Sequence, residues 1–217
     1  MNSGSAAKRG YVSPLRAQQA EATRWAVLRA AARLFAAHGY VGTSIADIAR
    51  EAGVSRATVS SSVGPKAVLL KQAYDTTIAG DDDPTPIPAR ATTRSFREQT
   101  TPSAVLDAYV AHAGPISARI AGLAEAVRGA AGADPDARAL WDEIRTQRHR
   151  AARMVVDAVL AVGELRDDLD PDTATDLVWV LNDGTLYYSL VHLRGWSHER
   201  FQAWRGEAIR TQLLGAP

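Results

Sequence analysis

Apolar residues recur at helical spacing through most of the chain, and glycine, proline and capping residues divide this pattern into helices. In the first helix Val27, Ala31 and Leu34 share one face, and Gly39 follows as a stop signal. Gly64-Pro65 breaks the chain again, and Pro65 favours a new helix start. The pattern therefore predicts four helices in the first 80 residues, at about Ala17–His38, Ile45–Glu51, Arg56–Ser62 and Lys66–Ala79.

The second half repeats one kind of punctuation. Thr101-Pro102, Asp134-Pro135 and Asp170-Pro171 each place a capping residue before a proline, as at a helix start. No run alternates β-branched and polar residues as a strand would. We therefore expect an all-α fold, with later helices at about Ser103–Ala113, Ile116–Ala130, Pro135–Ala161, Pro171–Arg194 and His198–Leu214.

Two stretches do not read as packed helices. Residues 1–16 mix Ser, Gly, Lys, Arg and Pro and read as a flexible basic arm, with a plain disordered tail as the alternative. Residues 81–101 hold an acidic triplet, three spaced prolines and scattered Thr and Arg, which indicates a linker. These stretches separate two predicted domains, residues 17–80 and residues 102–217.

Charge distinguishes the two parts of the chain. Residues 1–80 hold ten Lys or Arg against four Asp or Glu, whereas the remainder holds 15 against 20. A basic head on an acidic body suggests a polyanionic partner for the head alone. The absence of cysteine excludes disulfides and thiolate sites and fits a cytoplasmic location. No apolar run is long enough to span a membrane, so we expect no membrane partner.

Residues 45–62 carry the most informative pattern. Ser44 caps one short helix with Asp47 as its partner, and a Gly53-containing turn leads to Ser55, which caps the next. Two helices joined in this way form a helix-turn-helix arrangement. The second helix presents Arg56 and small residues outwards, which suits close approach to a DNA major groove.

At this point a resemblance is clear. The run VLRAAARLFAAHGYVGTSIADIAREAGVSRATVSSSVGPKAVLL, which starts at Val27, resembles the N-terminal domain of TetR-family regulators. The run LYYSLVHLRGWSHERFQAW in the second half is similar to one branch of that family. The resemblance implies a homodimeric repressor that binds a palindromic operator on double-stranded DNA and is released by a small organic ligand. The residues it places at DNA are Thr43, Ser44, Ser55, Arg56, Ala57, Thr58, Ser60, Ser61 and Lys66, with Thr43 and Lys66 at phosphates.

The sequence departs from the family pattern on the second helix of this motif. Ser60 stands where most members have a Tyr that reaches a phosphate, and Val63 stands where most have a Phe. Three successive serines also favour a helix less than the usual residues do. We expect weaker DNA binding or an unusual operator, with Lys8, Arg9 and Arg16 on the arm as a source of compensation.

In the second domain, large polar and aromatic residues interrupt apolar helices. We expect a ligand pocket that suits a planar or anionic organic molecule, although each residue has an ordinary core or surface role as its alternative. The predicted pocket residues are Tyr109, His112, Trp141, Arg145, Arg148, Trp179, Asn182, Asp183 and Tyr187. For the dimer interface implied by the family, with intrachain core as the alternative, the residues are Leu186, Leu190, Phe201 and Trp204.

Other classes of protein receive little support. No Ser-His-Asp arrangement, metal-ligand spacing or phosphate loop is present, and the five histidines are scattered. The acidic triplet at 81–83 has the composition of a solvated loop more than of a metal site. We expect no enzyme activity, no metal and no cofactor. The remaining rival is a sensor or scaffold that keeps the fold but has lost operator binding.

Overall fold

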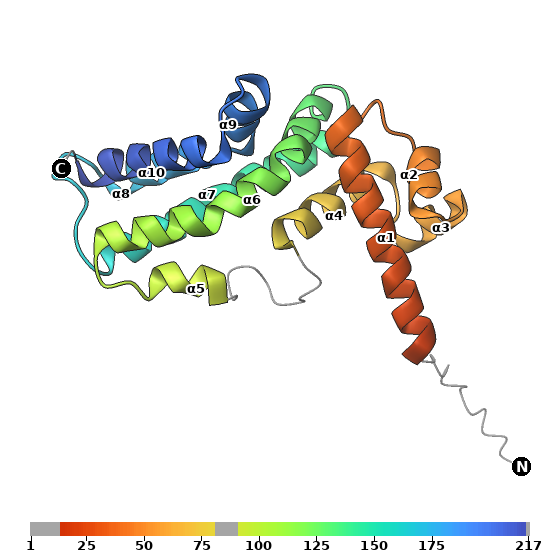
Figure 1. Cartoon of the computed structure of the whole chain (residues 1–217), viewed down its shortest axis with the longest axis horizontal. Coiled ribbons are helices and arrows are strands. Elements are labelled where there is room, and N and C mark those ends of the chain that lie inside the picture. Colours follow the sequence, from red (N-terminus) through yellow and green to blue (C-terminus); the bar gives the residue numbers. More distant parts are fainter. Residues whose placement is uncertain (1–13, 81–90, 216–217) are drawn as a thin grey trace, which may run out of the picture.

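The computed structural model describes residues 14–80 and 91–215, and within these ranges every element is helical (Figure 1). The expected all-α fold is confirmed. The elements are α1 (Pro14–His38), α2 (Ile45–Ala52), α3 (Arg56–Ser62), α4 (Lys66–Ala79), α5 (Ala91–Arg97), α6 (Pro102–Ala130), α7 (Pro135–Leu160), α8 (Pro171–Leu181), α9 (Gly184–Tyr187), a π-helix η2 (Tyr188–Leu193) and α10 (His198–Leu214).

The helices form two packed groups. Helices α1 to α4 pack around one another, while α6 and α7 form a long pair that α8 and α10 cover (Figure 1). Helices α1 and α4 also pack against α6, which joins the two groups. The first core cluster runs across this junction, because it combines Val27 and Phe35 of α1 with Leu123 and Val127 of α6.

The helix-turn-helix follows from local capping. The Ser44 side chain accepts a hydrogen bond from the Asp47 N–H, and the Asp47 carboxylate accepts one from the Ser44 N–H, which completes a capping box. Gly53 ends α2 with a φ of 69° and donates back to the last turn. Ser55 then caps α3 by accepting from the Thr58 N–H. The turn is thus held by its own side chains and by one residue in the left-handed conformation.

Three expectations about the helices were wrong. The helices expected at Ser103–Ala113 and Ile116–Ala130 are one continuous α6 with Pro115 inside it. A proline removes one backbone hydrogen bond but keeps a φ that a helix accepts. Residues on both sides of it, Ala113 and Ser117, are buried. Packing along both halves therefore keeps the helix continuous.

The helix expected at Pro171–Arg194 is interrupted. Helix α8 ends at Leu181, Asp183 caps the short α9, and the π-helix η2 follows. The Asp183 side chain accepts from the Thr185 N–H at 2.8 Å, so a new helix start is fixed inside the predicted helix. Single π turns are rare and occur often at functional sites.

The stretch expected as a linker contains a packed helix. Helix α5 lies within it, and Phe96 is only 2% exposed, with its ring 5.8 Å from that of Tyr109. Burial of one large aromatic side chain thus anchors a segment whose composition indicated a loop. Residues 81–90, which include the acidic triplet, lie outside the described residues, as do residues 1–13 of the predicted arm. Helix α1 begins at Pro14, three residues earlier than expected.

Gly53 provides a test of the turn. Replacing it with Ala places a Cβ on a left-handed residue, so Gly53→Ala should lower the free energy of unfolding by about 1–2 kcal/mol. The matched control is Gly129→Ala, because Gly129 lies inside α6 with nothing within 4 Å of an added Cβ. That change should instead raise stability by about 0.5–1 kcal/mol. Urea denaturation measures both, and equal effects would contradict this account of the turn.

Candidate DNA-binding face and effector site

Helix α3 exposes the residues that the sequence placed at the DNA groove. Arg56, Ala57, Ser60 and Ser61 are exposed, whereas Val59 between them is fully buried in the core. Arg56 forms no hydrogen bond or ion pair with any described residue, so its guanidinium is available to a partner. The face consists of one long cation and several short side chains.

The serines of α3 differ in what their hydroxyls do. The Ser61 hydroxyl donates to the Thr58 carbonyl and the Ser62 hydroxyl to the Val59 carbonyl, each at 3.2 Å. Ser55 Oγ lies 2.8 Å from Thr58 Oγ1, so these two hydroxyls share a hydrogen bond at the helix start. Back-bonding of this kind turns hydroxyls towards the helix itself. Ser60 is the exposed serine of α3 without such a bond.

Thr43 does not lie where the resemblance implied. Its side chain is 2% exposed, and its hydroxyl lies 2.8 Å from the Gly39 carbonyl oxygen and 3.1 Å from that of Leu34. The hydroxyl is used to close the turn after α1, so it does not present itself to a phosphate. Its neighbour Ser44 is exposed, but the Ser44 hydroxyl is already bonded within the α2 capping box. Thr43 and Ser44 therefore hold the turn and the start of α2 through hydrogen bonds within the chain.

Lys66 belongs to a small cluster that joins the two groups of helices. Its Nζ lies 4.3 Å from the centre of the Tyr40 ring, in a cation–π contact. The Tyr40 hydroxyl donates to the carboxylate of Asp134 at 3.0 Å, and Asp134 caps the start of α7. Burial and this bond raise the pKa of Tyr40 to about 12, and burial lowers the pKa of Lys66. The predicted phosphate-binding lysine thus contacts a residue bonded to the second domain.

The interruption between α8 and α9 forms the polar centre of the second domain. Arg148 of α7 donates to the Asp183 carboxylate at 2.9 Å and to the Trp179 carbonyl at 2.8 Å. The second of these bonds satisfies a carbonyl near the end of α8, where helical partners run out. Arg148 therefore stabilises the break itself.

Arg205 of α10 holds the same break from the other side, and sequence analysis missed it. It is fully buried, and its Nη1 donates to Asn182 at 3.0 Å and to Ser117 at 2.9 Å. A signal was present in the sequence, because Arg205 occupies an apolar line at four-residue spacing between Phe201 and Ile209. A cation inside such a line is a candidate functional group.

The remaining predicted pocket residues fall into two groups. Tyr109 is buried, the charges of Arg205 and Arg148 act on its hydroxyl, and burial raises its pKa to about 12. Tyr187 is also buried, with its hydroxyl 3.0 Å from His198 Nδ1. In contrast, Trp141 packs against the N-terminal core and Arg145 is exposed. His112 is half-buried, with its ring 6.2 Å from that of Phe96.

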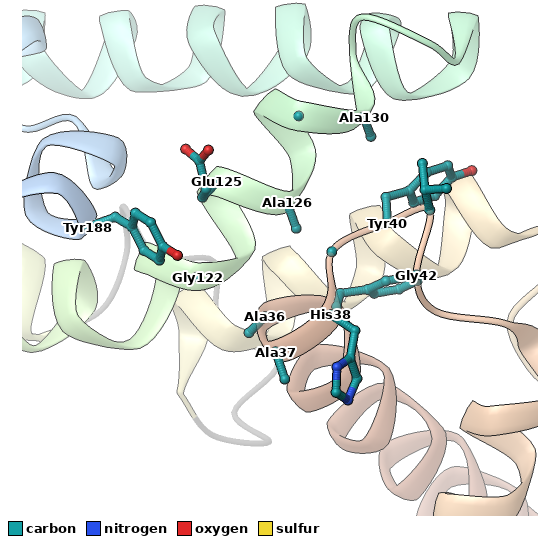
Figure 2. A pocket seen from close by; sticks show the side chains of 14 residues that line it. Ala36, Ala37, His38, Tyr40, Gly42, Gly122, Glu125, Ala126, Ala130 and Tyr188 are labelled. Atoms are coloured by element: carbon teal, nitrogen blue, oxygen red, sulfur yellow. The ribbon is translucent and has the colours of Figure 1, made fainter. Parts of the chain in front are cut away.

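A separate pocket of about 330 Å³ lies between the two groups of helices (Figure 2). The end of α1 and the turn after it form one wall, and α6 forms the other. Figure 2 shows Glu125 of α6 and Tyr188 of η2 on one side and Tyr40 on the other. Glu125 is already paired with Arg128 through two hydrogen bonds. The pocket therefore offers small residues, several aromatic rings and one carboxylate that is already paired.

The predicted dimer residues are not equally accessible. Leu186, Leu190 and Trp204 are partly exposed, and together with Trp196 they form the outer part of one cluster. Phe201 is 1% exposed and packs inside the chain, with its ring 4.8 Å from that of Tyr187. Phe201 therefore cannot form the outer surface of an interface in this conformation.

Two further searches of the described residues bear on other functions. No group of three or more His, Asp or Glu side chains there is arranged to hold a metal ion. No helix among them has the length and apolarity to cross a membrane.

Comparison with known proteins identifies a family match for the N-terminal region. Residues 27–73, which contain the capped turn and α3, match the model for bacterial regulatory proteins of the tetR family. This part of the chain has the N-terminal region of a TetR-family regulator. A search of curated proteins finds no match.

Solved structures extend the likeness in fold over 89–90% of the chain. A transcriptional regulator from Saccharomonospora viridis in complex with choline has a TM-score of 0.68 at 21% identity, covering 89% of this chain and 98% of that one. FadR from Bacillus subtilis in complex with stearoyl-CoA has a TM-score of 0.67 at 16% identity, with coverage of 89% and 99%. NalD, a repressor of a multidrug efflux pump in Pseudomonas aeruginosa, has a TM-score of 0.64 at 19% identity, with coverage of 90% and 98%.

The bond between Tyr40 and Asp134 should stabilise the protein measurably. Tyr40→Phe removes only the hydroxyl and should lower the free energy of unfolding by about 1 kcal/mol. Tyr188→Phe is the matched control, because the Tyr188 hydroxyl has no hydrogen-bond partner among the described residues. Denaturant titration measures both variants.

The effect of Tyr40→Phe should also depend on pH. Backbone bonds from α7 and the bond from Tyr40 lower the pKa of Asp134, so its contribution is present above the ordinary carboxyl pKa. That contribution is lost as the pH falls through the lowered value. The gap between wild type and Tyr40→Phe should therefore shrink in acid, and a gap that stays constant would show that the carboxylate is not the acceptor.

Proposed function

We propose that this TetR-family protein is a homodimeric repressor that binds a palindromic operator and leaves it when a small organic effector binds. The observation that carries the proposal is the exposed face of α3, held by a capped turn inside the region that matches the family model. The basic balance of residues 1–80 supports a polyanionic partner for this end of the chain.

The proposed DNA contacts divide into base and phosphate groups. Arg56, Ala57, Thr58 and Ser60 lie at the major groove, where Arg56 is the side chain able to bond a guanine edge with two parallel bonds. Lys66 lies at the edge of this face and contacts a phosphate. Ser55 and Ser61 lie at the same edge, with hydroxyls that are bonded within α3 in the free protein. Thr43 and Ser44 support the turn, because their hydroxyls are already engaged.

The proposed interface uses the outer surface of the helices from α8 to α10. Leu186, Leu190 and Trp204 contribute partly exposed apolar area, and Leu193 beside them is 65% exposed. A second copy of the chain covers this surface and places two α3 helices on successive half-sites. Half-sites one helical turn apart require such a pair.

The effector site is proposed at the interruption between α8 and α9. Arg148, Asn182, Asp183 and Tyr109 converge there. Similar folds have been solved with choline and with stearoyl-CoA, which supports a small organic molecule as the effector. The contact from Asp134 through Tyr40 to Lys66 offers a route from this domain to the DNA-binding group.

DNA binding tests the proposal directly. We expect the purified protein to bind the DNA upstream of its own gene more tightly than bulk DNA of equal length. The logarithm of the affinity should fall with that of salt at a slope of about −4 or steeper, which corresponds to about five phosphate contacts. Binding titrations at several salt concentrations measure this. A protein that prefers no site and shows a slope near zero is a sensor or scaffold instead.

Ser60 gives a sharper test of the DNA face. Ser60→Tyr restores the reach of a tyrosine hydroxyl to a phosphate, so the affinity for the upstream site should rise about five-fold. Ser103→Tyr adds the same side chain on the exposed start of α6, far from the turn, and should leave the affinity unchanged. Equal or weaker binding by Ser60→Tyr would contradict the role given to this position.

The dimer surface can be tested through Leu193. Leu193→Asp places a charge on the proposed apolar interface and should weaken dimerisation about ten-fold or more. Leu15→Asp is the control, because Leu15 is 62% exposed at the start of α1. Sedimentation equilibrium at several concentrations reports the dissociation constant. An unchanged dimer in Leu193→Asp would move the interface to another face.

A further inference from the structure

Arg205 carries a full positive charge in the core without a carboxylate partner. Its side chain is 0% exposed, and all of its acceptors are neutral groups. Nη1 donates to Ser117 and Asn182, while Nη2 donates to the Val110 carbonyl at 3.2 Å and to Gln202 Oε1 at 2.7 Å. No Asp or Glu among the described residues pairs with it. A buried charge of this kind is normally paired, because desolvation of an unpaired ion is costly.

Arg148, the other inward-facing arginine of this region, has the carboxylate partner that Arg205 lacks. Arg148, on the other side of the α8–α9 interruption, is paired with Asp183 at 2.9 Å. That pair is neutral as a unit, so the polar centre as a whole carries one excess positive charge, on Arg205. The chain supplies one anion for two inward-facing cations, and the missing charge is a single negative one.

Two buried donors at this site, one on Arg205 and one on Gln202, have no hydrogen-bond partner. Arg205 Nε and Gln202 Nε2 are both buried without a hydrogen bond. Nε and Nη2 lie along one edge of the guanidinium, which is an edge where a carboxylate binds with two parallel bonds. Gln202 Oε1 now occupies half of that edge. An amide oxygen brings no charge and leaves Nε unsatisfied, so Gln202 is an incomplete stand-in for a carboxylate.

The surroundings limit the rest of the ligand. The Phe201 ring centre lies 5.5 Å from the Arg205 guanidinium carbon, and Tyr109 acts on the same charge. Ile209 and Leu213 continue the buried line of α10 into an apolar cluster. A phosphate monoester, with nearly two negative charges at neutral pH, would leave one of them uncompensated. An organic monocarboxylate satisfies both the charge and the apolar surroundings.

We propose that Arg205 is the effector-binding residue of this protein and that it takes the carboxylate of an amphipathic organic acid. The acid replaces Gln202 Oε1 and accepts hydrogen bonds from Nε and Nη2, and Gln202, which is already partly exposed, turns towards solvent. Nη1 keeps its bonds to Ser117 and Asn182, so the ligand is tied to the α8–α9 interruption. This inference rests on the proposed function, since it names the chemical class of the effector.

Matched acids and amides test the inference on the full-length protein. Phenylacetate and hexanoate are compared with phenylacetamide and hexanamide, which have the same shape but no charge. The acids should raise Tm by about 5 °C when they are in large excess over their dissociation constants, and the amides should not. DNA binding is measured on the same preparations with and without each probe.

Variants separate recognition from structure. Arg205→Met removes the guanidinium and should lose the response to acids. Circular dichroism checks that the variant folds, because the change leaves Ser117 and Asn182 without this donor. Arg205→Lys keeps the charge but not the two parallel bonds, so the acid response should fall at least ten-fold in apparent affinity. Gln202→Ala clears the edge and should keep or strengthen the response. Arg200→Met removes an exposed arginine of the same helix, which stacks on Trp196, and should leave the acid response unchanged.

The results distinguish failure of the Arg205 assignment from failure of the proposed function. Equal Tm shifts for acids and amides, or no shift for either, overturn the assignment. An acid response that survives in Arg205→Lys and disappears in Gln202→Ala also overturns it, and these two variants decide if Arg205→Met does not fold. Site-specific DNA binding that persists without any acid response removes only this inference. Loss of site-specific DNA binding in the untreated wild type removes the proposed function instead.

Discussion

The second domain depends on how it satisfies an interrupted helix in its interior. Helix α8 ends at Leu181 and α9 begins at Gly184, so backbone groups and two polar side chains lie inside the bundle. Arg148 bonds one side of the break and Arg205 the other, through Asp183 and Asn182. Buried polar groups are costly when they are left unbonded, and most of those at the break have a partner. Helices α7 and α10 are thereby fixed to the same short segment, and the positions of four helices follow from it.

The junction of the two domains rests on a different kind of contact. Apolar side chains of α1 and α6 form a continuous core, so the DNA-binding group cannot rotate freely on the second domain. The Tyr40–Asp134 bond adds a directed contact at the edge of that core, and Asp134 also caps α7. A shift at the start of α7 therefore changes the surroundings of Tyr40 and of Lys66 above its ring. The apolar core sets the relative position of the two groups of helices. The Tyr40–Asp134 bond is the point at which a small movement of α7 would reach the N-terminal group.

Much of this structure could be predicted from the sequence where the cause was local. Ser44, Gly53 and Ser55 determine the helix-turn-helix by capping and by a left-handed glycine, and those rules involve residues a few positions apart. The three errors have non-local causes. Pro115 stays inside α6 because both flanks are packed, Phe96 makes a helix of a linker by burial, and partners on α7 and α10 bond the two residues at the break in α8.

The candidate site shows the same limit. Tyr109, Arg148, Asn182 and Asp183 were predicted as polar residues in apolar helices, and they converge. Trp141 and Arg145 have the same character in sequence but lie towards the N-terminal core and towards solvent. Spacing along one helix predicts which side chains lie on the same face. It does not predict which other helix, or solvent, that face meets. For Arg205 the sequence pattern of α10 indicates burial. That it has no carboxylate partner becomes evident only from the packing of α6, α8 and α10 around it.

The exposed face of α3 determines how such a protein would contact DNA. Its exposed residues are short except for Arg56, and two of its serines bond their own helix. Short side chains allow close approach but contribute few bonds, so affinity has to come from phosphate contacts and from two motifs acting together. A chain with this surface therefore depends on its dimer geometry more than one with long polar side chains would. Under the proposed function, an effector that alters the α8–α10 region would change the spacing of the two α3 helices, on which such a DNA-binding face depends most.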